Sequence, residues 1–208
     1  MTRRKESCEG FEKRLSKLSN ENFEVFKNKI INQGNPDHKG LRDYPAMNCI
    51  RNELYGWEFL EKEDYKNIEF IQDSDIAGNK SPDFRARKNR EPDVLLEVKT
   101  IFPSDKDMEG LKKLWENPNT IQWLNSSVGI EEGLWDKVEA DIKVAIKQID
   151  AYSNNGNFRK IIYLVISLDT GKTFNTENWD ELKRRLDILA KKYTEYEIIY
   201  YQKKFGGK

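Results

Sequence analysis

The sequence has very few of the residues on which several kinds of site depend. It contains 2 cysteines and 1 histidine among 208 residues. Two cysteines are too few for a disulfide scaffold or a cysteine-rich zinc site. The single histidine, His38, excludes histidine-based catalysis and histidine-rich metal sites. The sequence also has no glycine-rich phosphate-binding loop and no serine nucleophile in an elbow motif. Carboxylates and lysines therefore remain as the candidates for chemistry.

Long apolar runs are also absent. The longest uninterrupted apolar run is residues 161–166, whereas a membrane-spanning helix needs about 20 apolar residues. No apolar stretch follows the charged N-terminal residues 2–6, so we expect no signal peptide. We therefore expect a soluble, cytoplasmic protein without a membrane partner.

Neither sign of charge is in excess. Lysine plus arginine and aspartate plus glutamate both total 36, and charged residues make up 35% of the chain, above the ~25% of an average domain. A net charge of zero argues against a protein that coats nucleic acid by bulk charge, although a local basic face is still allowed. Hydrophobic residues make up 37% of the chain, which is enough for a folded core.

The chain divides at a cluster of glycine, proline and asparagine at residues 34–40, which predicts a linker. Before it, apolar spacing over residues 3–33 predicts a helix. We therefore expect an N-terminal helical extension over residues 1–45 and a core over residues 46–208. Within the core, clear periodicity is lost at about residues 103–133, which predicts an insert.

This insert contains Trp115 and Trp123. One interpretation is a lid or a platform on which bases stack. The other is that both side chains fill a secondary core. The sequence does not choose between them.

The pattern of the core alternates between helices and strands. Its order is helix, strand, strand, strand, helix, strand, helix, strand. This order predicts an α/β fold with a mixed central β-sheet flanked by helices. Helical spacing marks residues 46–55, 134–152 and 178–193, and strand character marks residues 68–72, 83–87, 93–101, 159–168 and 195–202.

Two of these strands form a predicted hairpin with its loop near residues 89–91. If paired residue numbers add up to 180, Phe84 faces Leu96 and Ala86 faces Val94 on one apolar side. A slip of one residue would turn this apolar set to the wrong side, so the register has a physical reason.

The other side of this hairpin is charged. Asp83 is expected opposite Glu97, and Arg87 opposite Asp93 as an ion pair. Cross-strand partners lie ~5 Å apart, and Lys99 stands ~6.6 Å beyond Glu97 on the same face. Two carboxylates and an ammonium therefore converge.

Such a cluster suits Mg²⁺, which binds one or two carboxylates together with waters and substrate phosphate. The ion polarises a phosphoryl oxygen and lowers the pKa of a bound water, and a lysine can orient that water or neutralise developing charge. The alternative is an ordinary hairpin with a solvated outer face. Against it, residues 95–99 place charges inside a strand otherwise built for burial, and buried charges need partners.

On these residues the chain resembles the PD-(D/E)xK nuclease superfamily, which has the restriction-endonuclease-like fold. The matching residues are Pro82-Asp83 followed by Glu97-Val98-Lys99, and the element order matches from about residue 46 to residue 202. The resemblance implies that Asp83, Glu97 and the backbone carbonyl of Val98 bind the metal and that Lys99 is catalytic.

The resemblance extends to two helices. Many members carry a glutamate on the helix before the first strand, and Glu53 sits at the matching place as a catalytic and metal-binding carboxylate or as a surface residue. RecB-type members carry Gln-x-x-x-Tyr, which Gln148 and Tyr152 match. Because residues four apart share a helix face, the two could position nucleic acid together, or Tyr152 could close the apolar stripe with Gln148 beside it.

A basic cluster lies next to the hairpin site. It could contact the phosphate backbone of nucleic acid, or it could be a solvated hairpin tip. We select Arg85 and Lys88 as its candidate nucleic-acid-binding residues. The cluster consists of Lys80, Arg85, Arg87, Lys88 and Arg90.

These observations together predict a Mg²⁺-dependent nuclease, with Mn²⁺ as a substitute metal, that hydrolyses phosphodiester bonds. DNA is favoured over RNA as its partner, and a homodimer is one option for its assembly. The alternative is a catalytically silent protein of nuclease fold that binds nucleic acid or a protein partner. An intact set of Asp83, Glu97 and Lys99 favours the enzyme on chemical grounds.

Overall fold

The structure is a computed structural model that describes six segments of the chain. The predicted linker at residues 34–40 lies outside them, as do Trp115 and Trp123 of the predicted insert. The described segments are residues 11–33, 43–71, 81–101, 132–153, 156–166 and 176–202.

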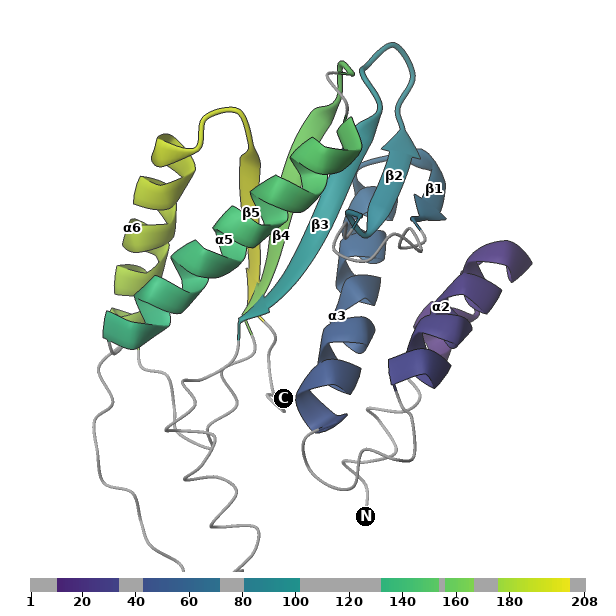
Figure 1. Cartoon of the computed structure of the whole chain (residues 1–208), viewed down its shortest axis with the longest axis horizontal. Helices are drawn as coiled ribbons and strands as arrows, with labels where there is room; N and C mark the ends of the chain where they lie inside the picture. The colour runs from purple at the N-terminus through teal and green to yellow at the C-terminus, as the bar shows by residue number, and fades with distance from the viewer. Residues whose placement is uncertain are drawn as a thin grey trace, which may run out of the picture.

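The centre of the fold is a five-stranded mixed sheet (Figure 1). Its spatial order, β1-β2-β3-β4-β5, is also the order along the chain. The first three strands pair antiparallel, and β3, β4 and β5 pair parallel. The predicted α/β class with a mixed sheet is thereby confirmed. The strands are β1 Lys66–Phe70, β2 Phe84–Arg87, β3 Val94–Ile101, β4 Arg159–Ile166 and β5 Glu197–Gln202.

Helices cover both faces of this sheet (Figure 1). One face carries α5 and α6, and the opposite face carries α3, with α2 lying against α3 and β1. From the second helix onward, the order of elements is the predicted one. The helices are α2 Asn20–Gln33, α3 Asp43–Lys62, α5 Glu132–Ser153 and α6 Thr176–Lys192.

Side-chain alternation along β3 divides the core into two layers. Val94, Leu96 and Val98 are buried on the α3 side, and Leu95 and Ile101 are buried on the α5 side. Successive side chains of a strand point to opposite faces. The charged residues at positions 97 and 99 therefore belong to the face that α5 covers.

The predicted single helix over residues 3–33 is wrong in its described part. Residues 11–15 are helical, residues 16–19 form a turn, and α2 then begins at Asn20. The Ser19 side chain accepts a hydrogen bond from the backbone N–H of Asn22 at 3.3 Å. A serine in this position caps the first turn of a helix, which is why a new helix starts here although the apolar spacing continues.

Helix α3 extends well beyond the predicted residues 46–55 and includes Gly56 in its interior. A Cβ atom at Gly56 would lie 2.6 Å from Cγ2 of Val98, so only glycine lets α3 approach β3 this closely. Glycine is a poor helix former. Here packing against the sheet outweighs that local preference.

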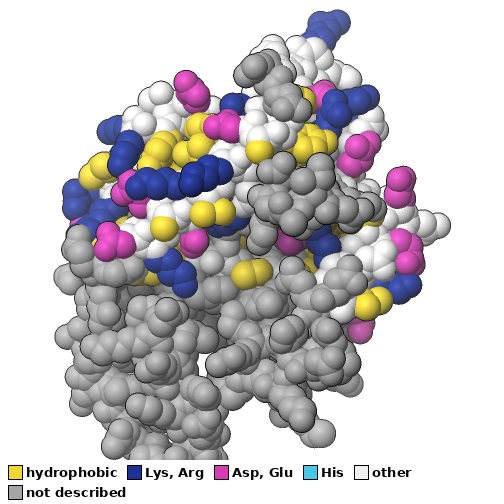
Figure 2. Space-filling view, in the orientation of Figure 1, with side chains coloured by type: hydrophobic (Ala, Val, Ile, Leu, Met, Phe, Trp, Pro, Cys, Tyr) yellow, Lys and Arg dark blue, Asp and Glu magenta, His cyan; other side chains and the backbone are white. Residues whose placement is uncertain are grey.

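Acidic and basic side chains intermingle on the face shown in Figure 2, with apolar side chains between them. Neither sign of charge forms a continuous field on this face, in keeping with the net charge of zero. Among the described helices, none combines the length and the apolar character that crossing a membrane requires.

Candidate active site

The predicted hairpin register is confirmed. Phe84 pairs with Leu96 and Ala86 pairs with Val94, and the loop turns at residues 88–91, where the N–H of Glu91 donates to the carbonyl of Lys88 at 3.2 Å. The apolar side of the hairpin is buried against α3. The charged residues on its other side therefore come together as the alternation predicts.

Asp83 and Glu97 meet where β2 begins. The N–H of Asp83 donates to Oε2 of Glu97 at 3.1 Å. Oδ2 of Asp83 accepts from the N–H of Val98 at 2.8 Å. The Asp83 carboxylate thus binds the β3 backbone just beyond the last paired residue of β2. Each carboxylate therefore accepts a hydrogen bond from a backbone N–H group.

Lys99 lies between β3 and α5. Its ammonium donates to Oε1 of Glu97 and to Oε1 of Gln148, both at 2.6 Å. Gln148 in turn donates through Nε2 to the carbonyl of Ser81 at 3.2 Å. The amide of Gln148 therefore joins the catalytic candidate on β3 to the segment that leads into β2.

Glu53 reaches the same cluster from α3, on the opposite side of the sheet from α5. Oε2 of Glu53 lies 2.9 Å from the ammonium of Lys29, and Oδ1 of Asp83 lies 3.3 Å from the same ammonium. Lys29 belongs to α2. Helices α2 and α3, strand β3 and the residue just before β2 therefore supply charged groups to one place, and α5 adds an amide.

This cluster is largely buried and rich in carboxylates. Glu97 is 3% exposed, and the side chains of Glu53 and Asp83 are 12% and 14% exposed. Within the part of the chain that the structure describes, these three carboxylates contact the ammonium groups of Lys29 and Lys99. Carboxylates held away from water in this way favour the binding of a further cation.

The environment shifts the pKa of Glu97 well above its ordinary value. Burial is the largest cause and the charge of Asp83 adds to it, while the ammonium of Lys99 opposes both. Burial alone would lower the pKa of Lys29, but the carboxylates of Asp83 and Glu53 outweigh that effect and raise it. The buried ammonium is therefore charged at neutral pH, and the buried glutamate resists ionisation.

The carboxylates of this cluster fit Mg²⁺ as that ion is bound when the protein provides only a few of its ligands. Among the described residues, no three Asp, Glu, Cys or His side chains are close enough to enclose a metal by themselves. Mg²⁺ does not need such a cage, because it binds one or two carboxylates and completes its octahedron with waters and phosphate. Asp83 and Glu97, with the backbone of Val98 beside them, provide that arrangement.

The two members of the predicted Gln-x-x-x-Tyr pair have different surroundings. Gln148 is buried in the site and contacts Lys99. Tyr152 is half-buried and packs against the apolar core on the α5 side of the sheet. Of the two, Gln148 is the one with a direct link to the charged cluster.

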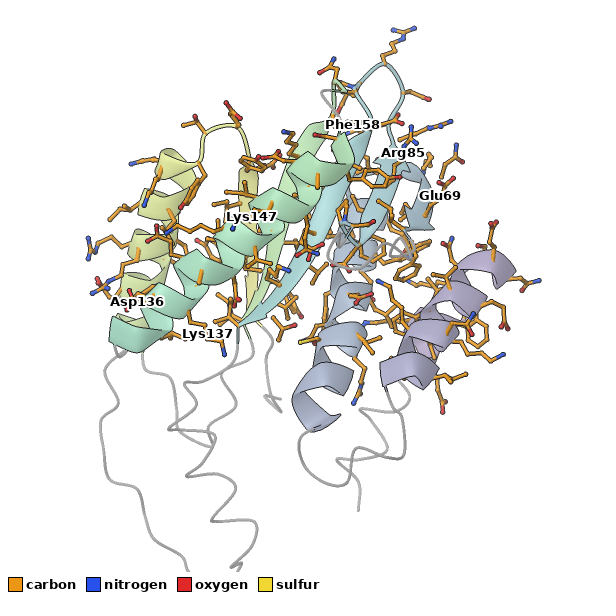
Figure 3. All side chains as sticks on the ribbon, in the orientation of Figure 1. Glu69, Arg85, Asp136, Lys137, Lys147 and Phe158 are labelled. Carbon is orange, nitrogen blue, oxygen red and sulfur yellow. The ribbon has the colours of Figure 1, made fainter. Side chains whose placement is uncertain are left out.

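The predicted nucleic-acid contacts lie closer to the hairpin loop. Arg85 donates to Oδ2 of Asp93 at 2.6 Å and lies 5.7 Å from the centre of the Phe158 ring. Figure 3 shows Arg85 and Phe158 close together, at the other end of α5 from Asp136 and Lys137.

Lys88 lies at the loop itself, where its ammonium is 3.6 Å from Glu91 and 5.4 Å from the centre of the Tyr65 ring. The expected ion pair between Arg87 and Asp93 is confirmed at 3.4 Å. Arg85 lies on the same face of this short strand and pairs with the same carboxylate at 2.6 Å.

The sequence interpretation missed Lys29 and the carbonyl of Ser81. Lys29 follows Phe26 by three residues and Asn22 by seven, which places all three on one face of α2. That spacing was the only available indication. Its partners are 24 and 54 residues away along the chain, too far for any local pattern to connect.

Comparison with known proteins gives no relative from which a role could be carried over. No protein-family model matches the chain, and neither a curated protein nor a solved structure matches it. A role for the cluster of Asp83, Glu97 and Lys99 therefore has to follow from its own chemistry.

Proposed function

We propose that the chain is a Mg²⁺-dependent nuclease with a restriction-endonuclease-like core, which hydrolyses phosphodiester bonds of DNA and accepts Mn²⁺ as a substitute. The observation that carries the proposal is the buried hydrogen bond from the backbone N–H of Asp83 to the Glu97 carboxylate, with Lys99 beside it. Two carboxylates brought together in a largely buried place need a cation, and neither apolar packing nor a structural ion pair requires two of them there.

In this proposal Asp83, Glu97 and the carbonyl of Val98 hold the metal, and Glu53 is an additional carboxylate of the site. A bound Mg²⁺ would polarise a phosphoryl oxygen and make hydroxide available near neutral pH. Burial and the charge of Asp83 both raise the pKa of Glu97, and a bound divalent cation would oppose both effects.

Lys99 is the group best placed to act on the reacting phosphate or on the attacking water. Its ammonium is held at 2.6 Å from both Glu97 and Gln148. A fixed charge of this kind stabilises negative charge that develops in the transition state. Gln148 acts through Lys99 as a positioning residue, since its amide bridges the lysine and the backbone of Ser81.

A second candidate function is nucleic-acid binding without cleavage. The observation that favours it is the pairing of the carboxylates with the ammonium groups of Lys29 and Lys99. The burial of Glu97 favours the enzyme, because a site retained only for binding phosphate gains nothing from buried carboxylates.

The deciding experiment is a cleavage assay on linear duplex, circular and single-stranded DNA and on RNA, with Mg²⁺, Mn²⁺, Ca²⁺ or EDTA. We expect cleavage with Mg²⁺ and Mn²⁺ and none with EDTA. Asp83→Asn keeps the size of the side chain and one acceptor oxygen for the N–H of Val98, so it should abolish cleavage while the protein remains folded.

Cleavage that persists in EDTA would contradict the metal mechanism. Binding of nucleic acid by the wild type with no cleavage under any metal would favour the second candidate. The matched control is Asp150→Asn, because Asp150 forms its ion pair with Lys160 away from the cluster, and its removal should leave cleavage unchanged.

A further inference from the structure

Lys29 is the one member of the charged cluster that neither the hairpin nor the resemblance predicts. Its ammonium lies 2.9 Å from Oε2 of Glu53 and 3.3 Å from Oδ1 of Asp83. The side chain is 21% exposed, so it reaches inward from α2 to a largely buried position. It already does what a cation would do there, since it neutralises carboxylates from two different elements.

Lys29 contacts the oxygen of Asp83 that is not hydrogen-bonded to the β3 backbone. Oδ2 of Asp83 is engaged by the N–H of Val98 at 2.8 Å, and Oδ1 faces the ammonium. A divalent ion coordinated through Oδ1 would lie next to that ammonium, and two cations on one oxygen repel each other. Binding of the metal and the present position of Lys29 are therefore in competition.

Helix α2 itself is fastened to the edge of the sheet. The Asn22 side chain accepts from the N–H of Phe70 at 3.1 Å and donates to the carbonyl of Ile68 at 3.0 Å. Phe26, one turn further, is buried with its ring centre 5.6 Å from that of Phe70. Displacement of the ammonium therefore requires movement of the long Lys29 side chain and not of the helix.

An ammonium displaced in this way stays within side-chain reach of the cluster, because the contacts of α2 with β1 hold its Cα atom in place. The anion that arrives with the metal is the phosphate of the nucleic acid. We propose that Lys29 is a further substrate-binding residue, which neutralises Asp83 and Glu53 before the metal binds and contacts a phosphate oxygen of the nucleic acid afterwards. This inference rests on the proposed nuclease function.

The test compares Lys29→Met with the wild type in two binding measurements that do not depend on turnover. The first is titration calorimetry with Ca²⁺ and with Mn²⁺ in the absence of nucleic acid. Removal of the competing ammonium should tighten metal binding about 5–10-fold. Metal should also raise the melting temperature of the variant more than that of the wild type, because binding to the native state stabilises it.

The second measurement is the affinity for a short DNA duplex in Ca²⁺, at several salt concentrations at which the duplex stays uncut. Lys29→Met should bind the duplex about 5–10-fold more weakly, and the slope of log affinity against log salt should fall by about one. Lys29→Arg should restore duplex affinity, because it keeps the positive charge. Lys29→Gln is a second uncharged variant, and its amide can still donate to the carboxylates.

The matched control is Lys27→Met. Lys27 lies on the same helix, is exposed, and pairs only locally with Glu24 at 3.0 Å. It should match the wild type in both measurements.

Unchanged or weaker metal binding by both Lys29→Met and Lys29→Gln, or unchanged duplex affinity, would overturn the inference. If the wild type binds and cuts DNA with metal while the variants have the same metal and duplex affinities, the inference about Lys29 is wrong and the proposed nuclease function stands. If the wild type binds neither Ca²⁺ nor Mn²⁺, the proposed nuclease function is wrong as well.

Discussion

Two carboxylates four residues apart, one just before β3 and one within it, have opposite environments. Asp93 lies next to the hairpin loop, where Arg85 binds it at 2.6 Å and lowers its pKa. Glu97 lies at the other end of the hairpin, where burial and the charge of Asp83 raise its pKa. Over this short stretch of chain, the surroundings of Asp93 therefore favour its charged form and those of Glu97 disfavour it.

The difference lies in the balance of charges and not in the strand itself. Next to the loop, Arg85 and Arg87 both form ion pairs with Asp93, whose side chain is 24% exposed. In the described part of the cluster, the carboxylates of Glu53, Asp83 and Glu97 form ion pairs with Lys29 and Lys99 and have little access to water. An arrangement of the first kind stabilises a fold modestly, whereas one of the second kind costs stability unless a ligand compensates it.

The strongest test of this difference between Asp93 and Glu97 is to replace each carboxylate by its amide and to measure cleavage. Glu97→Gln should lower turnover by ~10³-fold or more, since it removes a ligand of the proposed metal at nearly constant side-chain volume. Asp93→Asn should leave turnover within a few-fold of the wild type. Equal losses in the two variants would mean that the cluster has no special role.

Removal of the ammonium at the cluster should have the next largest effect. Lys99→Ala should lower turnover by ~10²-fold while the affinity for nucleic acid changes only a few-fold, as expected for a group that acts in the transition state. Lys160→Ala is the control on the neighbouring strand, because its ammonium pairs with Asp150 at 2.7 Å outside the cluster. A loss of affinity equal to the loss of turnover would instead make Lys99 a binding residue.

The loss of the amide that holds Lys99 should be smaller. Gln148→Ala should lower turnover by ~10-fold, in the range found for groups that orient a catalytic partner. Tyr152→Ala should instead cost about 2 kcal/mol of stability through lost packing. A Gln148→Ala protein with wild-type turnover would remove Gln148 from the site.

The stability of the metal-free protein should show the raised pKa of Glu97 directly. The native state binds a proton that the unfolded chain releases, so this group's contribution is complete below pH 4.5 and is lost as pH rises through the higher native pKa. The melting temperature of Glu97→Gln relative to the wild type should therefore rise from acid to neutral pH. For a chain of this size about 2–4 °C corresponds to 1 kcal/mol. A constant difference would contradict the shift.

The contribution of Asp93 to stability should depend on pH in the opposite direction, and its effect should be the smallest of those predicted. Its lowered pKa means that its contribution to stability is present above pH 3.8 and is lost as pH falls through the lower native value. Asp93→Asn should cost ~1 kcal/mol at neutral pH and nothing in strong acid. Urea denaturation at both pH values measures this, and a cost that persists in acid would assign it to packing.

The hairpin was predictable because its register depends on local alternation. Phe84 and Leu96 must both face the core, and this requirement alone brings Asp83 opposite Glu97. The length of α3 was not predictable from local preference, because Gly56 is tolerated only through its close packing on Val98. Apolar spacing likewise failed to reveal the turn before α2, which a serine cap determines.

The sequence by itself determined the α/β class, the hairpin register and the three residues Asp83, Glu97 and Lys99, because each follows from periodicity over a few residues. Only the tertiary structure decided that Lys29 joins them and that Gln148, a candidate from the resemblance, contacts Lys99. Lys29 and Gln148 come from helices whose rotation is set by the packing of their apolar faces. That packing is a property of the assembled core, so it brought a second ammonium to the carboxylates that no short pattern indicated.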